Sequence, residues 1–363
     1  MKHDTKTPLI RLAKRDSMSG GAMWAIRIGS IILSLLLGCL VILITGNNPF
    51  EAYGVMVKGS LGGKVYLQQT IKIAIPLLGC ALAIAPCFKM RFWNIGAEGQ
   101  ITAGALGATF VARMLQDTLP SLPLLILMCL AAIIAGGIWG LIPAFFKAKW
   151  NSNETLFTLM MNYIIIGVVG WLQNGPWEGR QGRMAQFSDT AMLPKVLGIH
   201  CGWIIVLAMV LIIFFYMKYT KQGFEIAVIG DSMNTARYSG MNVGYVMMRT
   251  MFLSGAICGI TGFIVLSGAN GTLAHDIANG VGFTAITVAW LSQLNPFAMI
   301  VISMMLAILT KGADTLQTQM NVPASLSNII IGLLLFCMLG CEFFINFKLI
   351  FRSKKAEKEV SAK

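Results

Sequence analysis

Four polar side chains, Asn94, Glu98, Gln100 and Asn162, lie where the surrounding sequence is mostly apolar. The first three belong to one string, Phe92-Trp93-Asn94-Ile95-Gly96-Ala97-Glu98-Gly99-Gln100, and Asn162 stands among Met, Leu, Tyr and Ile. Amides and a carboxylate inside a membrane are costly unless they bind a neighbouring helix or serve a function. We predict that these four residues line or gate a polar path, and we predict no catalytic residue.

A purely structural interpretation of the same residues stays open. Asn94 is a suitable N-cap for a helix that begins beside it, and Glu98 then lies near the positive end of that helix. Asn153, followed by Glu154, has the pattern of another helix start. Asn162 can equally hydrogen-bond a neighbouring helix.

The stretch from Gly223 to Gly240 is the second region whose residue pattern points to a function. It is too polar to cross a membrane and too regularly patterned for an irregular loop, so it predicts a short amphipathic helix between glycines. Such a helix either lies along the membrane surface or docks onto a cytosolic protein.

The elements that must position these residues are predicted to be membrane-spanning helices. Of the 363 residues, 56% are apolar and 12% charged, against about 45–50% and about 25% in soluble domains. An apolar stretch of about 20 residues crosses the bilayer as a helix. We expect about ten such helices, over residues 23–45, 70–86, 95–115, 122–146, 155–173, 199–219, 250–268 and 327–347, with two shorter ones over 281–293 and 296–310.

The charged residues predict the orientation. Most of the 28 Lys and Arg residues lie on one side if the N-terminus is cytoplasmic, which places both termini inside and gives an even number of spans. We expect a cytoplasmic segment over 1–22, a transmembrane domain over 23–347 with a cytoplasmic loop at 218–249, and a basic cytoplasmic tail over 348–363. The formal charge of +13 is spread between the spans, so we expect membrane lipid and no nucleic acid as a partner.

Several kinds of chemistry lack their motifs in this sequence. It contains no Gly-x-x-x-x-Gly-Lys-[Ser/Thr] phosphate loop, no Cys/His metal spacing and no Cys-x-x-Cys pair. We therefore disfavour an intramembrane enzyme or an assembly scaffold, and expect no metal and no cofactor on this chain. Seven of the eight cysteines are interpreted as small hydrophobic residues, and the eighth, Cys87, beside Lys89 at a span end, is the one expected to be accessible.

These motifs, in this order, resemble those of the permease subunits of bacterial ABC importers for simple sugars and nucleosides, in the branched-chain amino-acid and ribose permease superfamily. The resemblance is carried by residues 92–100, by 153–163, by 223–240 followed by Ser254-Gly255-Ala256, and by 282–286. It implies an all-α membrane protein with the type II ABC importer permease fold, of about ten transmembrane helices in two halves of inverted topology. The Asn-Ile-Gly-Ala-Glu-Gly-Gln variant resembles that of the nucleoside branch of this family, and the resemblance therefore implies nucleosides rather than sugars.

The resemblance also implies partners. These are a second, different permease subunit, a cytosolic ATPase that hydrolyses the ATP, and an extracellular substrate-binding lipoprotein, all at the bacterial cytoplasmic membrane. Residues 223–240 match the segment that meets the ATPase. The residues expected to make that contact are Gly223, Glu225, Gly230, Asp231, Asn234, Ala236, Arg237 and Gly240.

The alternative is a stand-alone secondary transporter that uses an ion gradient. Such proteins need carboxylates inside their spans, and these are scarce in this chain, where Glu98 and Glu342 both lie near span ends.

Overall fold

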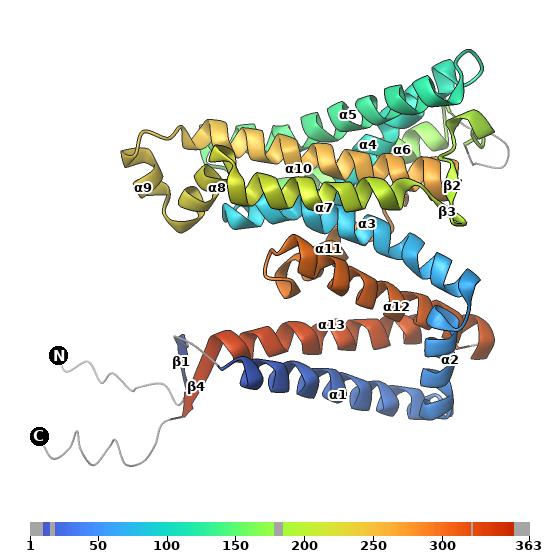
Figure 1. Ribbon diagram of the computed structural model, residues 1–363, viewed down its shortest axis with the longest axis vertical. Coiled ribbons are helices and arrows are strands. Elements are labelled where there is room, and N and C mark those ends of the chain that lie inside the picture. Colours follow the sequence, from blue (N-terminus) through green and yellow to red (C-terminus); the bar gives the residue numbers. More distant parts are fainter. Residues whose placement is uncertain (1–9, 15–18, 178–183, 321, 352–363) are drawn as a thin grey trace, which may run out of the picture. The chain divides into compact units, whose positions relative to one another are not determined.

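The structure is a computed structural model that describes residues 10–14, 19–177, 184–320 and 322–351 (Figure 1). The chain divides into two compact units, one of Met1–Val55 with Leu316–Lys363 and one of Met56–Thr315. The helices are α1 Gly20–Ile44, α2 Pro49–Leu61, α3 Lys64–Lys89, α4 Ala97–Leu115, α5 Ser121–Trp150, α6 Glu154–Gln173, α7 Gly202–Tyr219, α8 Lys221–Asp231, α9 Met233–Tyr238, α10 Val243–Val265, α11 Val281–Leu291, α12 Pro296–Met320 and α13 Ala324–Asn346.

The first unit is built on an antiparallel contact between α1 and α13. Beyond these helices, strands β1 (Ile10–Lys14) and β4 (Phe347–Phe351) pair antiparallel, with Ile10 opposite Phe351. The hydroxyl of Tyr53 donates a hydrogen bond of 2.8 Å to the carbonyl of Leu35 and so ties the start of α2 to α1. Residues 1–9, 15–18 and 352–363 lie outside the described part, so the predicted cytoplasmic segments 1–22 and 348–363 stay predictions.

The second unit is organised around α10, which packs against α3, α4 and α5 (Figure 1). Small residues allow the close approach of these helices: a Cβ on Gly255 of α10 would overlap the carbonyl oxygen of Gly136 on α5. Gly136 and Gly255 therefore lie at the contact between α5 and α10. Backbones that approach this closely gain van der Waals contact, which drives helix association in lipid.

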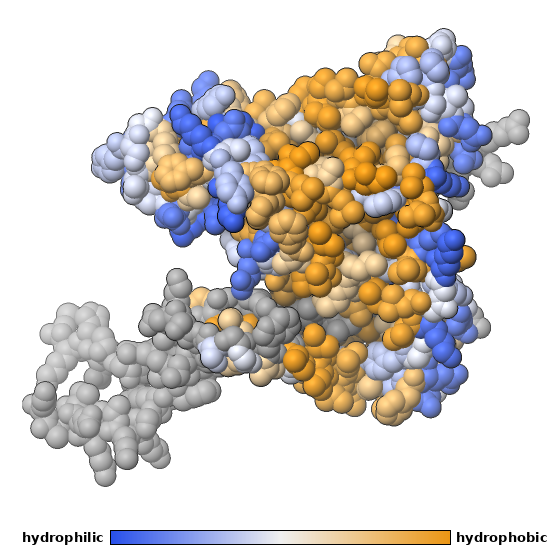
Figure 2. Space-filling view, viewed as in Figure 1, coloured by the Kyte–Doolittle hydropathy of each residue, from blue (hydrophilic) through white to orange (hydrophobic). Residues whose placement is uncertain are grey.

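The surface and the helix lengths confirm an all-α, multi-pass membrane protein. Eight helices in the described part of the chain, α1, α3, α5, α6, α7, α10, α12 and α13, are long and apolar enough to cross a membrane. In Figure 2 the visible surface of the second unit is hydrophobic over α5, α7 and α10 and hydrophilic over α8 and α9. Ten spans and two inverted halves stay predictions.

Helix α4 coincides with a predicted span but is not among these eight. It is rich in Ala, Gly and Thr, and nearly all of its first half is buried against other helices. A helix surrounded by protein needs small residues for close contact rather than the large apolar side chains that face lipid.

Some element boundaries differ from the sequence prediction. A helix over 199–219 was expected, but Ile199–His200 forms strand β3 and pairs with β2 (Lys195–Val196). Between them Leu197 and Gly198 both have positive φ, 58° and 81°, as a tight hairpin turn requires. Helix α10 begins at Val243 rather than near residue 250, because the side chain of Asn242 accepts a hydrogen bond from the amide of Tyr245 at 3.1 Å and caps it.

Candidate functional site

The four predicted path residues meet at the start of α4, in a network that we call the polar junction. It consists of Asn94, Glu98, Gln100, Thr158, Asn162 and Ser254 together with the backbone groups that they bind. Each of the six side chains is buried. Three helices far apart in sequence contribute to it: α4, α6 through Thr158 and Asn162, and α10 through Ser254.

Asn94 lies in the connection between α3 and α4 and holds that connection against α10. Its Nδ2 donates to Ser254 Oγ at 3.1 Å and to Gln100 Oε1 at 3.3 Å. Its Oδ1 accepts from the amide of Gly96 at 2.9 Å and from Gln100 Nε2 at 3.3 Å. The prediction that Asn94 is itself the N-cap is wrong by two residues: Gly96 occupies that position, and Asn94 binds its amide from outside the helix.

Asn162 caps α4 from another helix. Its Oδ1 accepts from the amide of Gly99 at 2.9 Å, and its Nδ2 donates to the carbonyl of Ile95 at 3.0 Å. The amide of Gly99 is one of the first-turn donors that have no partner within their own helix. Asn162 therefore supplies the missing hydrogen-bond partner at the start of α4, although it lies 63 residues further along the chain.

Glu98 binds the start of α11 in the same way. Its two carboxylate oxygens accept from the amides of Gly280 and Gly282, each at 2.7 Å. Because a Cβ on Gly282 would overlap the backbone nitrogen of Glu98, the first turns of α4 and α11 are in direct contact. The carboxylate thus lies at the positive ends of two helices, which stabilises its charge.

In this conformation the polar junction is satisfied by the protein itself. The exposed fraction is 0% for Asn94, 5% for Glu98, and 1% for Gln100 and Asn162. Hydrogen bonds to neighbouring elements engage all four side chains, so each of them positions helices. That they line or gate a path stays a prediction, and it requires the junction to open.

Replacing Asn162 by Ala is expected to loosen the contact between α4 and α6. The change leaves the amide of Gly99 and the carbonyl of Ile95 without their side-chain partner, at a cost of about 1–3 kcal/mol for each group. Thermal unfolding of the purified protein in detergent measures the loss. Tyr163→Phe is the matched control, because Tyr163 is adjacent and 62% exposed; equal unfolding temperatures for the two variants would contradict the assigned role of Asn162.

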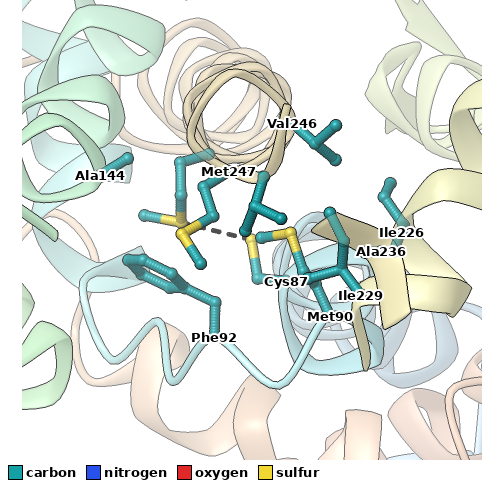
Figure 3. Close-up of a cluster of buried hydrophobic side chains, with 11 residues drawn as sticks. Cys87, Met90, Phe92, Ala144, Ile226, Ile229, Ala236, Val246 and Met247 are labelled. Atoms are coloured by element: carbon teal, nitrogen blue, oxygen red, sulfur yellow. Dashed lines mark hydrogen bonds between the residues drawn. The ribbon is translucent and has the colours of Figure 1, made fainter. Parts of the chain in front are cut away.

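The predicted contact segment folds as two short helices, α8 and α9, rather than one. They pack on a buried cluster whose members come from α3, α5, α8, α9 and α10 and from the connection after α3 (Figure 3). The cluster consists of Cys87, Met90, Phe92, Ala144, Ile226, Ile229, Ala236, Val243, Val246, Met247 and Met251. This cluster joins α8 and α9 to the ends of the long helices.

The eight predicted contact residues comprise three buried ones, four exposed ones and the half-buried Glu225. Gly223, Gly230 and Ala236 are buried, and a Cβ on Gly230 would overlap the carbonyl oxygen of Lys89. These three cannot touch another protein in this conformation; they allow α8 and α9 to pack closely on the long helices. The exposed members are Asp231, Asn234, Arg237 and Gly240.

Glu225 has a partner within the chain. Its Oε2 accepts a hydrogen bond from Arg249 Nη2 at 3.0 Å, and both side chains are largely buried, with 16% and 21% exposed. The pair ties α8 to the first turns of α10. The sequence reasoning did not single out Phe224 and Tyr238, which are 61% and 92% exposed on the same segment. The signal that could have identified these two residues is the presence of large aromatic side chains in an otherwise polar helical segment.

The expected accessibility of Cys87 is wrong. Its side chain is 0% exposed, and its thiol donates to the sulfur of Met251 at 3.4 Å within the buried cluster (Figure 3). The basic neighbour Lys89 indicated a span end correctly, but α8 and α9 fold over that end and cover Cys87.

The chain combines a multi-pass helical bundle, a buried polar junction and an exposed pair of helices that is tied to the long helices. These are the features of a transport subunit. The sequence model of the family described as Branched-chain amino acid transport system / permease component matches residues 66–339. The chain belongs to this family. The predicted class, a permease subunit rather than a stand-alone secondary transporter, is thereby confirmed, and in this class ATP is hydrolysed by a separate subunit.

Individual relatives agree with this class. A glucose ABC transporter permease of Haloferax volcanii is 30% identical over 93% of each chain. A guanosine ABC transporter permease of Bacillus subtilis is 29% identical over 84% of this chain and 90% of its own length. A nucleoside ABC transporter permease of Lactococcus lactis is 22% identical over 87% of this chain and 90% of its own length.

Proposed function

We propose that this chain forms the translocation path of an ATP-driven importer for a nucleoside. The observation that carries the proposal is the motif string 92–100, folded as the polar junction, in a chain similar to guanosine and nucleoside permeases. Import of a simple sugar is the second candidate, because the glucose permease of Haloferax volcanii is also similar over nearly its whole length.

The partners follow from the same proposal. A cytosolic ATPase binds the exposed face of α8 and α9 and hydrolyses ATP, and an extracellular lipoprotein delivers the substrate. Two guanosine permeases of Bacillus subtilis, 29% and 23% identical to this chain, support a second permease subunit that differs from this one. This chain binds no cofactor, and both its termini lie in the cytoplasm of a bacterium.

The contacts offer a route from the ATPase to the path. A force on α8 and α9 reaches α3 and α10 through the buried cluster, because Ile226, Ile229 and Ala236 pack there with Met90 and Met251. Phe92 of the same cluster stands two residues before Asn94, which binds Ser254 of α10. A small shift of α10 relative to the connection after α3 would therefore break the Asn94–Ser254 bond and open the polar junction.

Uptake of radiolabelled guanosine tests the proposal. Membrane vesicles carry the two permeases and the lipoprotein, with or without the ATPase, and glucose is measured in parallel. Guanosine uptake that requires the ATPase supports the nucleoside importer, and ATPase-dependent uptake of glucose alone supports the sugar importer. Uptake without the ATPase that stops when the ion gradient is collapsed would overturn the proposal.

The double variant Arg237→Glu with Tyr238→Ala is expected to uncouple the ATPase. Both residues are exposed on α9, and Arg and Tyr are prominent among side chains that dominate binding at protein interfaces. We expect the affinity of the permease for the ATPase to fall by about 30-fold or more. Co-purification and ATPase titration measure it. Lys195→Glu, a charge reversal at an exposed residue of β2, is the control and should bind normally.

A further inference from the structure

An aromatic pocket lies beside the polar junction and takes no part in it. It has a volume of about 200 Å³ and is lined by Phe88, Arg91, Phe92, Trp93 and Trp290. The first four belong to the last turn of α3 and the connection that follows it, and Trp290 belongs to the last turn of α11. Gly230 of α8 contacts the carbonyl of Lys89 at this same end of α3, so the pocket is at the α8–α9 end of the second unit.

Three rings form the wall of the pocket. Their centroids are 5.6 Å apart for Phe88 and Trp93, 5.6 Å for Phe88 and Trp290, and 5.7 Å for the two tryptophans. Phe88 is buried, but Trp93 is 47% and Trp290 41% exposed. The two indoles therefore rest on a fixed base and leave ring surface open to a ligand.

The backbone places Arg91 at the pocket at some cost. Arg91 has φ 58°, in the left-handed region. It ends α3 with the bond pattern of a Schellman motif, in which the amide of Phe92 donates to the carbonyl of Cys87 and the amide of Arg91 to that of Phe88. Glycine or asparagine is usual at this position, so Arg91 holds a backbone conformation that an arginine rarely adopts.

The ligand that fits this lining is a flat heteroaromatic ring. Two exposed indoles stack on such a ring, and a guanidinium stacks on it or donates hydrogen bonds to its ring nitrogens and carbonyl oxygens. The volume is below the roughly 300–1,000 Å³ of pockets that enclose drug-sized ligands, so it suits one base rather than a whole nucleoside. A sugar ring has no π face and presents only C–H bonds to this wall, whereas a base offers both a π face and acceptors for the Arg91 guanidinium.

We propose that the Trp93–Trp290 pocket binds the purine or pyrimidine base of the transported nucleoside at the α8–α9 end of the path. This inference rests on the proposed function and names the part of the substrate that the permease itself recognises. Phe92 belongs both to the pocket and to the cluster under α8 and α9. Movement of these helices on the ATPase therefore changes the pocket directly and releases the base.

A tryptophan that only anchors the protein at the membrane surface would behave differently. Its replacement changes insertion or amount of protein and does not distinguish one substrate from another. Trp171 of α6 provides the matched control, because it is 65% exposed and takes no part in lining the pocket.

The test measures equilibrium binding of radiolabelled guanosine to the purified complex of permeases and ATPase without the lipoprotein. In Trp93→Leu and Trp290→Leu the dissociation constant is expected to rise by about 5- to 150-fold, the effect of losing one stacking surface. Trp93→Phe and Trp290→Phe should restore binding to within a few-fold, Trp171→Leu should bind normally, and excess ribose should not compete.

Two further measurements keep the outcome clear. Photolabelling of the wild-type complex with 8-azidoguanosine should modify residues 88–93 or Trp290. This experiment uses the wild-type protein and so does not depend on the folding of any variant. Wild-type uptake of guanosine separates the two proposals: normal uptake with unchanged binding in both Leu variants would overturn the pocket alone. No guanosine uptake in the wild type would overturn the proposed function and the pocket with it.

Discussion

Glu98→Ala is expected to destabilise the protein by about 2–6 kcal/mol and to abolish transport. The variant removes the acceptor of two amide groups, those of Gly280 and Gly282, which bind the carboxylate at 2.7 Å each. Each buried donor left without a partner costs about 1–3 kcal/mol. The start of α11 would then lose its attachment to α4, and the polar junction its geometry. Thermal unfolding in detergent and uptake by the assembled transporter measure the two effects.

Glu98→Gln separates the two functions of the side chain. The amide retains one acceptor, but its NH₂ group faces an N–H donor, so one of the two bonds is lost and the cost should be about half that of the Ala variant. A Gln variant that transports normally would remove Glu98 from the predicted path residues. The unfolding temperature should therefore fall clearly in the Ala variant, because a loss of 1 kcal/mol lowers it by about 2–4 °C in proteins of 150–250 residues and by somewhat less in a longer chain. An Ala variant that unfolds within about 2 °C of the wild type would contradict the structural role as well.

Gly255→Val is expected to prevent the protein from accumulating in the membrane. A Cβ at this position would overlap the carbonyl oxygen of Gly136, and a backbone atom cannot rotate away as a side chain can. Forcing extra atoms into a packed core typically costs about 1–3 kcal/mol, and we expect the upper end or more where two backbones touch. Quantitative immunoblotting of membranes and size-exclusion chromatography of the extract measure the loss.

The same substitution at another helical glycine controls for the helix propensity of valine. Gly167 lies within α6, and a Cβ there would meet no atom within 4 Å. Gly167→Val should accumulate as the wild type does. If Gly255→Val accumulates equally well, α5 and α10 do not pack through this glycine, and the central contact of the second unit is misplaced.

The sequence predicted the helices well because each long apolar run has one stable conformation in lipid. Each of the ten expected segments overlaps a helix of the structure, although several of these helices extend beyond the predicted bounds. Helix α2 was not predicted, because Pro49–Leu61 is too short and too polar to have the pattern of a span.

Burial of the segment over 223–240 could not be predicted from its composition. The sequence marks it as polar, helical and bounded by glycines, all of which the structure has. Only the tertiary structure shows that Gly230 and Ala236 face inward, and that Glu225 pairs with Arg249, 24 residues away. The exposed face that remains for a partner is therefore smaller than the motif.

The polar junction shows the same division most clearly. Residue types alone left two interpretations of Asn94, Glu98 and Asn162 open, path residues or residues that bind helix ends and neighbouring helices, because a lone amide or carboxylate in lipid needs partners. Which helix each one serves depended on the fold. Asn162 caps α4 from 63 residues away, and Glu98 binds Gly282 of α11 across 184 residues. The N–H groups at a helix start can donate to any oxygen that packing brings within reach, so local sequence predicts the need for a cap but not the residue that supplies it.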